Sequence, residues 1–141
     1  CMGADRIREA AGAAERERPG VYDEYVVGDI TDLPGKEEAK LESVEPDVLT
    51  CVAALGFGDI PPEAFLAGFD QVREGGWVAF CIKDAFVSEA DKSGFAKLID
   101  EMIDKGTIEV VSTHKYVHRV AFSGEELRYV AYIARKRSSH A

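Results

Sequence analysis

The sequence lacks any long apolar run. No run approaches the ~18–20 residues that a membrane-spanning helix needs, and no charged stretch followed by an apolar one opens the sequence as a signal peptide would. These two absences predict a cytoplasmic protein with no membrane partner.

Positive charge is also scarce. Lys and Arg total 17 against 26 Asp and Glu, which gives a formal net charge of −9. Affinity for nucleic acid comes largely from Lys and Arg, so this balance predicts that nucleic acid is not a partner. The one basic cluster, Arg135–Arg137, is short and is interpreted as a solvated end.

Cysteines are few and have no metal-binding spacing. Cys51 and Cys81 lie inside apolar runs, where a free Cys behaves as a small hydrophobic residue. A catalytic Cys would need an exposed, electropositive setting. Since the sequence also has no Ser-His-Asp order, phosphate loop or HExxH motif, we predict no metal site and leave the catalytic residues unassigned.

The rest of the chain is organised around one strand–helix–strand segment. Asp47–Ala54 is a continuous apolar run typical of a strand buried on both faces. Pro61–Glu63 then opens a helix, since Pro and an acid suit its first turn, and Gly75–Gly76 is expected to stop it. Trp77–Ile82 is a second apolar strand. The segment predicts a βαβ unit.

Further elements flank this unit in an alternating pattern. Together with 141 residues, 46% of them apolar, the pattern predicts one α/β domain with a mainly parallel sheet. The expected helices and strands are the tail of a strand at Cys1–Asp5, a helix at Arg6–Arg18, a strand at Tyr25–Gly28, a helical turn at Glu37–Leu41, a helix at Gly94–Lys105, strands at Thr107–Thr113 and Lys115–Phe122, and a last strand at Arg128–Arg135.

An acidic loop, Asp29–Pro34, directly follows the Tyr25–Gly28 strand. Ligand contacts in α/β sheets lie beyond the carboxyl ends of strands, so Asp29 and Asp32 are candidates for such contacts. The alternative is that both simply cap a turn.

Another candidate set is His114, Tyr116 and His118, which share one side of a strand by their period-two spacing. They could serve as a substrate base or as metal ligands. The alternative, a surface face of an edge strand, is favoured because no third metal ligand has a recognisable spacing.

Three segments resemble parts of a known family. GDITDLP, DVLTCVAAL and REGGWVAF, in this order and spacing, resemble class I S-adenosylmethionine-dependent methyltransferases. More narrowly, they are similar to the methyltransferase-like group that includes the Williams–Beuren region protein 27. The resemblance implies a Rossmann-like methyltransferase sheet, mostly parallel with an antiparallel C-terminal strand, in one partial domain over residues 1–141.

The resemblance also implies the residues that would bind S-adenosylmethionine. Asp5 would hold the ribose hydroxyls, because a carboxylate accepts two hydrogen bonds from a diol. Asp29 would accept from the adenine amino group beside the Ile30 backbone. Ala53 and Leu55 would lie under the cofactor, unless they are simple core residues.

Substrate contacts follow from the same resemblance. Phe57 and the loop at 58–62 would face a small-molecule substrate, although Phe57 could instead pack in the core. Ser88–Ser93 is a candidate lid on the substrate side. The strand at Asp47–Ala54 ends in AALG. Amino-group methylases of nucleobases and amides have an Asn/Asp-Pro-Pro-aromatic motif there, so the sequence speaks against those substrates.

One part of the family pattern is missing, namely the glycine-rich first strand and loop that wrap the methionine end of the cofactor. The resemblance therefore begins near the end of the second strand, which implies an N-terminally truncated domain. Without the first strand, the third and fourth strands would be separated, with exposed strand edges. Three outcomes are open: a longer natural protein, a homodimer through the exposed sheet edge, or direct pairing of the third strand with the fourth.

If the chain is complete as given, cofactor binding would be weakened or lost. The alternative function is then a non-catalytic methyltransferase-like domain that acts through dimerisation or partner binding. The methyl acceptor stays unidentified from the sequence.

Overall fold

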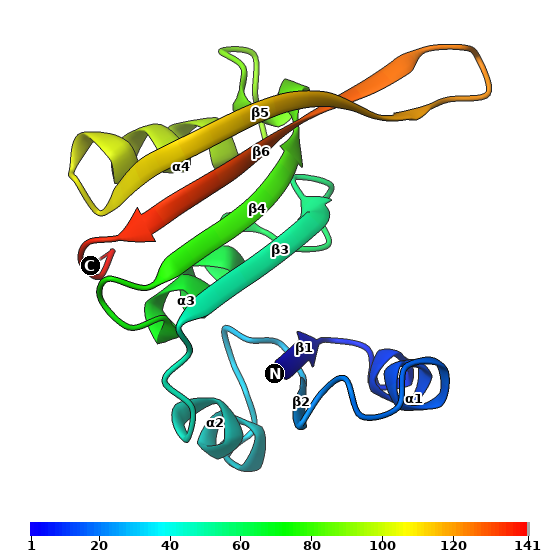
Figure 1. The fold of residues 1–141 in the computed structure, drawn as a ribbon, viewed down its shortest axis with the longest axis vertical. Helices are drawn as coiled ribbons and strands as arrows, with labels where there is room; N and C mark the ends of the chain where they lie inside the picture. The colour runs from blue at the N-terminus through cyan, green and yellow to red at the C-terminus, as the bar shows by residue number, and fades with distance from the viewer. Residues whose placement is uncertain (141) are drawn as a thin grey trace. The chain divides into compact units, whose positions relative to one another are not determined.

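The structure, a computed structural model, describes residues 1–140, and the chain forms two compact units divided after Glu45. The first unit contains β1 (Met2–Asp5), α1 (Arg8–Glu17), β2 (Glu24–Val27) and α2 (Gly35–Glu42). The second contains β3 (Val48–Leu55), α3 (Pro62–Gln71), β4 (Trp77–Lys83), the 3₁₀ helix η1 (Asp84–Val87), α4 (Phe95–Asp104), β5 (Ile108–Val120) and β6 (Glu126–Lys136) (Figure 1). Among the described residues, no helix combines the length and apolar character that crossing a membrane requires.

The first unit is built on a two-stranded parallel sheet. β1 and β2 pair from Met2 opposite Glu24 to Asp5 opposite Val27. Neither α1 nor α2 has a fully buried residue, although α2 is tied to β2 where the Val27 N–H donates to Glu37 at 3.0 Å. Local hydrogen bonds therefore hold much of this unit together.

The second unit is a four-stranded mixed sheet with the order β3-β4-β6-β5. β3 and β4 run parallel, joined by α3 as the βαβ pattern predicted, while β6 is antiparallel to both β4 and β5. The expected α/β fold and antiparallel finish are confirmed. The sheet is mixed rather than mostly parallel, because β5 and β6 are joined by a short turn that can link only antiparallel strands.

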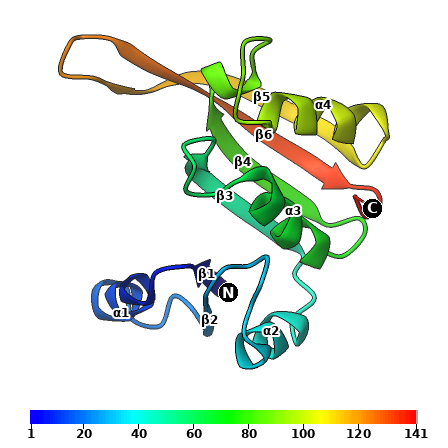
Figure 2. The same cartoon turned by 180° about the vertical axis from the view of Figure 1, so that it is seen from behind.

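The core of the second unit lies on one face of its sheet. Both α3 and α4 pack on this face, as the front and back views show (Figure 2). Period-two alternation directs alternate strand side chains toward these helices. The buried cluster contains Leu55, Phe65, Phe69, Val78, Phe80, Ile82, Phe95, Leu98, Ile99, Met102, Ile108 and Ala134.

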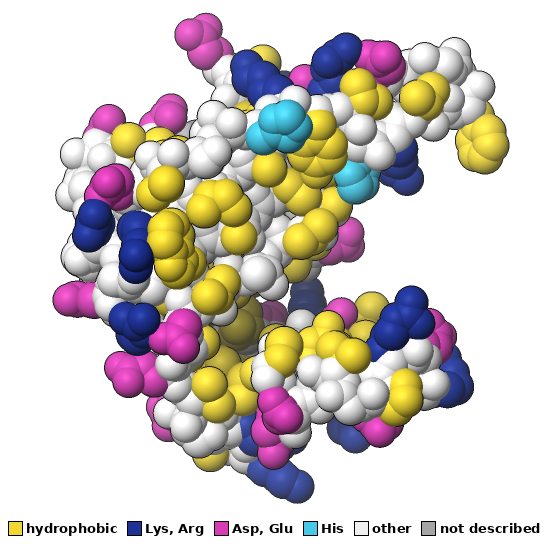
Figure 3. All heavy atoms as spheres, in the orientation of Figure 1, with side chains coloured by type: hydrophobic (Ala, Val, Ile, Leu, Met, Phe, Trp, Pro, Cys, Tyr) yellow, Lys and Arg dark blue, Asp and Glu magenta, His cyan; other side chains and the backbone are white. Residues whose placement is uncertain are grey.

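The opposite face of this sheet has no helix from residues 46–140 packed on it. Hydrophobic side chains gather there over the strands (Figure 3), and Val48, Val52 and Ile133 are 47%, 71% and 40% exposed. The prediction that Asp47–Ala54 is buried on both faces is therefore wrong. Its apolar run packs against helices on one side only, with Leu49 and Cys51 toward the core.

The end of α3 and the presence of η1 differ from expectation. α3 ends at Gln71, before Gly75–Gly76, because Val72 leaves the helix in an extended conformation and its side chain is buried. η1 was not predicted. β5 runs through residues 108–120 as one long strand, in which the segment after Lys115 continues the one that begins near Thr107.

The basic cluster Arg135–Arg137 is not the solvated end that was expected. Lys136 is buried, and its ammonium donates to the carbonyls of Phe69, Asp70 and Val72 at 2.9, 3.2 and 2.7 Å. These carbonyls lie at the end of α3, where helical carbonyls lack the usual donors, although the Phe69 carbonyl also accepts from the Val72 N–H at 3.1 Å. Lys136 thus caps a helix that is distant in sequence.

The third and fourth strands of the family pattern correspond here to β2 and β3, and the structure does not pair them directly. In residues 1–140, β2 pairs with β1, and β3 pairs with β4, in two separate sheets. The edge of β3 that faces away from β4 carries no strand partner in that part of the chain.

Candidate functional site

In the first unit, Asp5 and Asp29 follow adjacent parallel strands. Asp5 ends β1, and Asp29 comes two residues after β2, whose last residue, Val27, pairs with Asp5. The carboxyl ends of parallel strands share one sheet edge, so the two acids lie at the same edge. The Gly28 N–H donates to the Asp5 carbonyl at 2.9 Å and fixes this turn.

The Asp29 carboxylate takes part in a local turn. One of its oxygens accepts from the Thr31 hydroxyl at 2.6 Å and from the Thr31 N–H at 3.0 Å. Hydrogen bonds from the Thr31 hydroxyl and then the Thr31 N–H hold the pKa of Asp29 below its usual range, with a smaller contribution from Arg6, whose guanidinium lies 4.0 Å away. Asp29 is therefore a turn cap, and its other oxygen faces the Arg6 guanidinium.

Asp5 and Ile30 occupy the same edge in different ways. Asp5 is exposed and accepts a hydrogen bond from the Ile7 N–H at 2.9 Å. Ile30 is half-buried in the turn after Asp29. The structure thus brings the three residues predicted for the nucleoside end of the cofactor to one edge of β1–β2.

In the second unit, β3 ends in an irregular bulge. Its register against β4 shifts between Val52 and Leu55, and Ala53 has a φ of +56°, in the left-handed region that non-glycine residues seldom adopt. The Ala53 N–H donates to the Cys81 sulfur at 3.2 Å instead of to a carbonyl. Backbone strain of this kind clusters at functional sites.

Leu55 and Phe57 diverge beyond the bulge. The Leu55 side chain is completely buried in the core, so only its backbone is available to a ligand. Phe57 is 49% exposed and packs edge-on against Phe86 of η1, with ring centroids 4.9 Å apart. Gly56 allows this close packing, because a Cβ there would lie 2.3 Å from the Phe86 ring.

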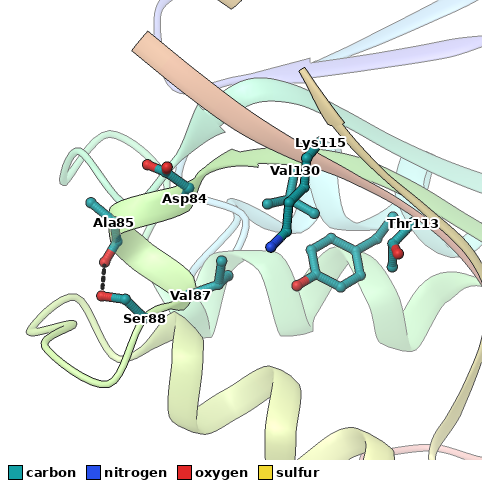
Figure 4. A pocket seen from close by; sticks show the side chains of 8 residues that line it. Asp84, Ala85, Val87, Ser88, Thr113, Lys115 and Val130 are labelled. Atoms are coloured by element: carbon teal, nitrogen blue, oxygen red, sulfur yellow. Dashed lines mark hydrogen bonds between the residues drawn. The ribbon is translucent and has the colours of Figure 1, made fainter. Parts of the chain in front are cut away.

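A hollow of about 500 Å³ lies beside η1, on the helix-covered side of the sheet (Figure 4). Its lining comes from η1, from Ser88 directly after it, and from alternate residues of β5 and β6. The lining residues are Asp84, Ala85, Val87, Ser88, Thr113, Lys115, Val130 and Tyr132. The predicted lid, Ser88–Ser93, begins at its rim.

Strand register explains how β5 and β6 line this hollow. Thr113 pairs with Tyr132 and Lys115 with Val130, so the four side chains form a block on one face. The Tyr132 ring stacks on Phe80 at 4.9 Å, which fixes its orientation. Burial, with a contribution from Asp100, raises the pKa of Tyr132, so its hydroxyl stays a neutral donor near pH 7.

A second hollow of about 550 Å³ shares Thr113 and Tyr132 with the first. Its walls are largely apolar, from Ile103, Ile108 and Val110, and an ion pair between Glu109 and Arg137 lies at its margin. Apart from the shared Thr113 and Tyr132, its polar side chains are Glu109 and Arg137, which pair with each other.

The row of His114, Tyr116 and His118 does share one side of β5, as predicted. The His114 and Tyr116 rings lie parallel at 6.0 Å, and His118 contacts Tyr129 at 4.3 Å. A hydrogen bond with Cys81 and then burial raise the pKa of Tyr116 to about 12. Residues 1–140 contain no group of three His, Cys, Asp or Glu side chains placed to hold a metal ion.

Comparison with known proteins adds information at the level of the fold. No family profile matches the sequence, and no curated protein matches it significantly. Solved structures do match. The N-methyltransferase NodS from Bradyrhizobium japonicum has a TM-score of 0.62 at 14% identity, over 97% of this chain and 73% of its own.

A methyltransferase from Methanosarcina mazei matches equally well. Its TM-score is 0.62 at 13% identity, over 97% of this chain and 82% of its own. The fold is that of S-adenosylmethionine-dependent methyltransferases. NodS has also been solved with S-adenosyl-L-homocysteine bound.

The methyltransferase fold alone does not fix the reaction. The [4+2]-cyclase SpnF matches with a TM-score of 0.59 at 12% identity, over 97% of this chain. Function must therefore be argued from the residues of this chain. Sequence reasoning missed the hollow, whose only sequence signals are Asp84 at a strand end and the period-two spacing of Thr113 and Lys115.

Proposed function

We propose that the protein binds S-adenosylmethionine and methylates a small molecule. The observation that carries the proposal is the likeness, over 97% of the chain, to solved methyltransferases. In this fold class, ligands bind beyond the carboxyl ends of the strands. Asp5, Asp29, the Ala53 bulge and Phe57 all follow such ends.

The acceptor groups in the first unit fit the nucleoside half of the cofactor. Asp5 would accept from the ribose diol, and the Asp29 oxygen that faces Arg6 would accept from the adenine amino group, because carboxylates are acceptors only. The glycine-rich loop for the methionine half has no counterpart in the sequence. When bound, the cofactor would supply an activated methyl group.

The protein's remaining task is to align the acceptor. Transfer from an activated methyl depends mainly on orientation of the reacting groups, so a dedicated catalytic base is unnecessary for many acceptors. The Phe57–Phe86 pair links the end of β3 to η1, which lines the first hollow. A hollow of about 500 Å³ suits a small molecule rather than a macromolecule.

Isothermal titration with S-adenosylhomocysteine tests the proposal. Micromolar binding is expected, corresponding to about −8 kcal/mol. Asp29→Ala should weaken it about tenfold or more by removing the adenine acceptor. Glu38→Ala, which removes an exposed carboxylate of α2 in the same unit, is the matched control and should bind normally. No heat at millimolar ligand would rule out the methyltransferase function for this chain.

A second candidate function, homodimerisation by a non-catalytic domain, is favoured by the free edge of β3. Val48, Thr50 and Val52 are exposed along this strand, and an apolar edge strand is a template for pairing with another chain. Sedimentation equilibrium should then show a dimer that Val52→Lys dissociates. Val21→Lys, at an exposed apolar position in the first unit, should leave the dimer intact. A monomer for the unmodified chain would eliminate this candidate.

A further inference from the structure

We propose that the hollow beside η1 binds the carboxylate of a small, partly apolar molecule. We further infer that this molecule is the methyl acceptor, an assignment that rests on the proposed methyltransferase function. The hollow itself is defined entirely within the second unit, by η1, β5 and β6.

The polar groups of the hollow are mostly donors. Lys115 contributes an ammonium, and Thr113 and Tyr132 contribute hydroxyls. In Figure 4 the Lys115 side chain extends into the space between η1 and the strands. Lys115 forms no ion pair with any residue among 1–140, so its charge is available to a ligand. Charge-assisted bonds to a carboxylate are about twice as strong as neutral ones.

The acceptor groups of the hollow are turned away or already engaged. The Asp84 carboxylate lies at the rim and points away from Lys115 (Figure 4). The Ala85 carbonyl is engaged because it accepts from the Ser88 hydroxyl at 2.9 Å. Asp84 would repel a second negative charge, so the arrangement favours a ligand with one carboxylate over a dianion such as a phosphate.

The remaining walls are apolar and fixed in place. Val130 is buried, Val87 packs against the core, and the Tyr132 ring is held by its stack on Phe80. A ligand with an apolar or aromatic body could therefore lie against these walls while its carboxylate meets Lys115. Small-molecule sites commonly combine apolar walls with a few placed polar groups in this way.

The hollow is also linked to the end of β3 through η1. Phe86 packs against Phe57 and over Gly56, while its neighbours Ala85 and Val87 line the hollow. The residues that would face a cofactor and those that would hold a carboxylate thus meet through a single turn of 3₁₀ helix. This connection through η1 is the reason for assigning the hollow to the methyl acceptor.

Binding of 3-phenylpropionate, followed by ¹⁵N–¹H NMR, tests the proposal without requiring activity. We expect saturable shifts of the Val87, Thr113, Lys115 and Val130 amides at about 10 mM ligand or below. The amide analogue 3-phenylpropionamide and the amine phenethylamine have the same aromatic body without a carboxylate. Both should bind about tenfold more weakly or not at all, since they lack the charge-assisted contact.

Two variants locate the contact. Lys115→Gln should weaken 3-phenylpropionate binding about tenfold, whereas Lys97→Gln, the same charge change on the exposed face of α4, should not. Tyr132→Phe keeps the stack on Phe80 and should give a smaller loss. Thermal unfolding of each variant checks that the fold is retained.

The proposal is overturned if the amide analogue binds as well as the carboxylate, if Lys115→Gln has no effect, or if no shifts appear. Titration of the same samples with S-adenosylhomocysteine separates the two proposals. Carboxylate binding without cofactor binding would retain the site and remove its role as an acceptor site. Cofactor binding without carboxylate binding would retain the methyltransferase proposal and overturn the carboxylate site.

Discussion

The two compact units differ in how their functional residues are held. The second unit has a continuous buried cluster between its sheet and the helices α3 and α4. In the first unit, Val26 is the one large hydrophobic side chain among those fully buried, and neither helix buries a residue. Two-stranded sheets are marginal in water, so the first unit has little stability of its own to contribute.

The residues predicted to contact a cofactor are supported differently in each unit. Phe57 and the Ala53 bulge are anchored to a packed core through Leu55 and Phe86. Asp5 and Asp29 depend on hydrogen bonds to Ile7 and Thr31 in exposed turns. A site is only as precise as the structure that supports it, so we expect the nucleoside contacts to be the less preorganised part.

The largest effect should come from Phe69→Ala in the second unit. Phe69 is completely buried, and removing such a ring costs about 3–5 kcal/mol of unfolding free energy. Urea unfolding followed by fluorescence of Trp77, the single tryptophan, measures this unit directly. Ile7→Ala, at an exposed position in the first unit, is the control. Equal losses for both variants would contradict the contrast between the units.

Lys136→Met should have the next largest effect. The Lys136 ammonium satisfies three carbonyls at the end of α3 and lies 4.6 Å from the centre of the Phe69 ring. Met keeps the length and apolar stem but leaves the carbonyls without this donor, so we expect a loss of about 1.5–3 kcal/mol. Lys97→Met on the exposed face of α4 should be near neutral. A stabilised Lys136→Met variant would show that burying the ammonium costs more than its bonds return.

Residues near Lys136 show what sequence patterns can predict. Helices α3 and α4 and strands β3 and β4 were predicted because apolar spacing directly reflects which side faces the core. The burial of Lys136 was not predictable, because it depends on α3 ending beside β6. Lys136 and Val72, whose carbonyl accepts from the Lys136 ammonium, are 64 residues apart in the sequence. A basic tripeptide carries no local signal of that contact.

The candidate site shows the same division. Asp29 was singled out from its place after an apolar strand, which is local information, whereas Ala53 was singled out from the resemblance to methyltransferases. The Lys115–Tyr132 hollow depends on the register between β5 and β6, and η1 has too short an apolar pattern to reveal its helical turn. The second role of Asp29, as a cap for Thr31, follows from turn chemistry and was foreseen as the alternative.

A smaller effect, with a defined pH dependence, is expected at Asp91. Its carboxylate accepts from the Ser93 hydroxyl and from the Ser93, Gly94 and Ala96 N–H groups at the start of α4. Partial burial opposes ionisation, but these hydrogen bonds, the Ser93 hydroxyl first, set the pKa of Asp91 below its usual value. Asp91→Ala should cost about 1 kcal/mol at pH 7, as loss of a helix cap does.

The sign of the pH effect follows from the lowered pKa. The unfolded chain binds a proton at Asp91 more readily than the folded one, so the contribution is complete above the ordinary value of 3.8 and is lost as pH falls through the lower folded pKa. The difference in stability between the unmodified chain and Asp91→Ala should therefore narrow below about pH 4. A difference that is constant from pH 7 to pH 3 would contradict the role of the carboxylate.

The smallest effect on the Trp77 transition should come from Val26→Ala. Val26 is the buried centre of β1–β2, so its truncation should increase hydrogen exchange at the Val27 and Gly28 amides, which donate to Glu37 and Asp5. Since sites in separate units are nearly additive, the Trp77 transition should shift by less than about 0.5 kcal/mol. A shift approaching that of Phe69→Ala would show instead that the two units unfold together. The exposed turns of Asp5 and Asp29 would then share the stability of the packed core, and the expected weakness of the nucleoside contacts would be wrong.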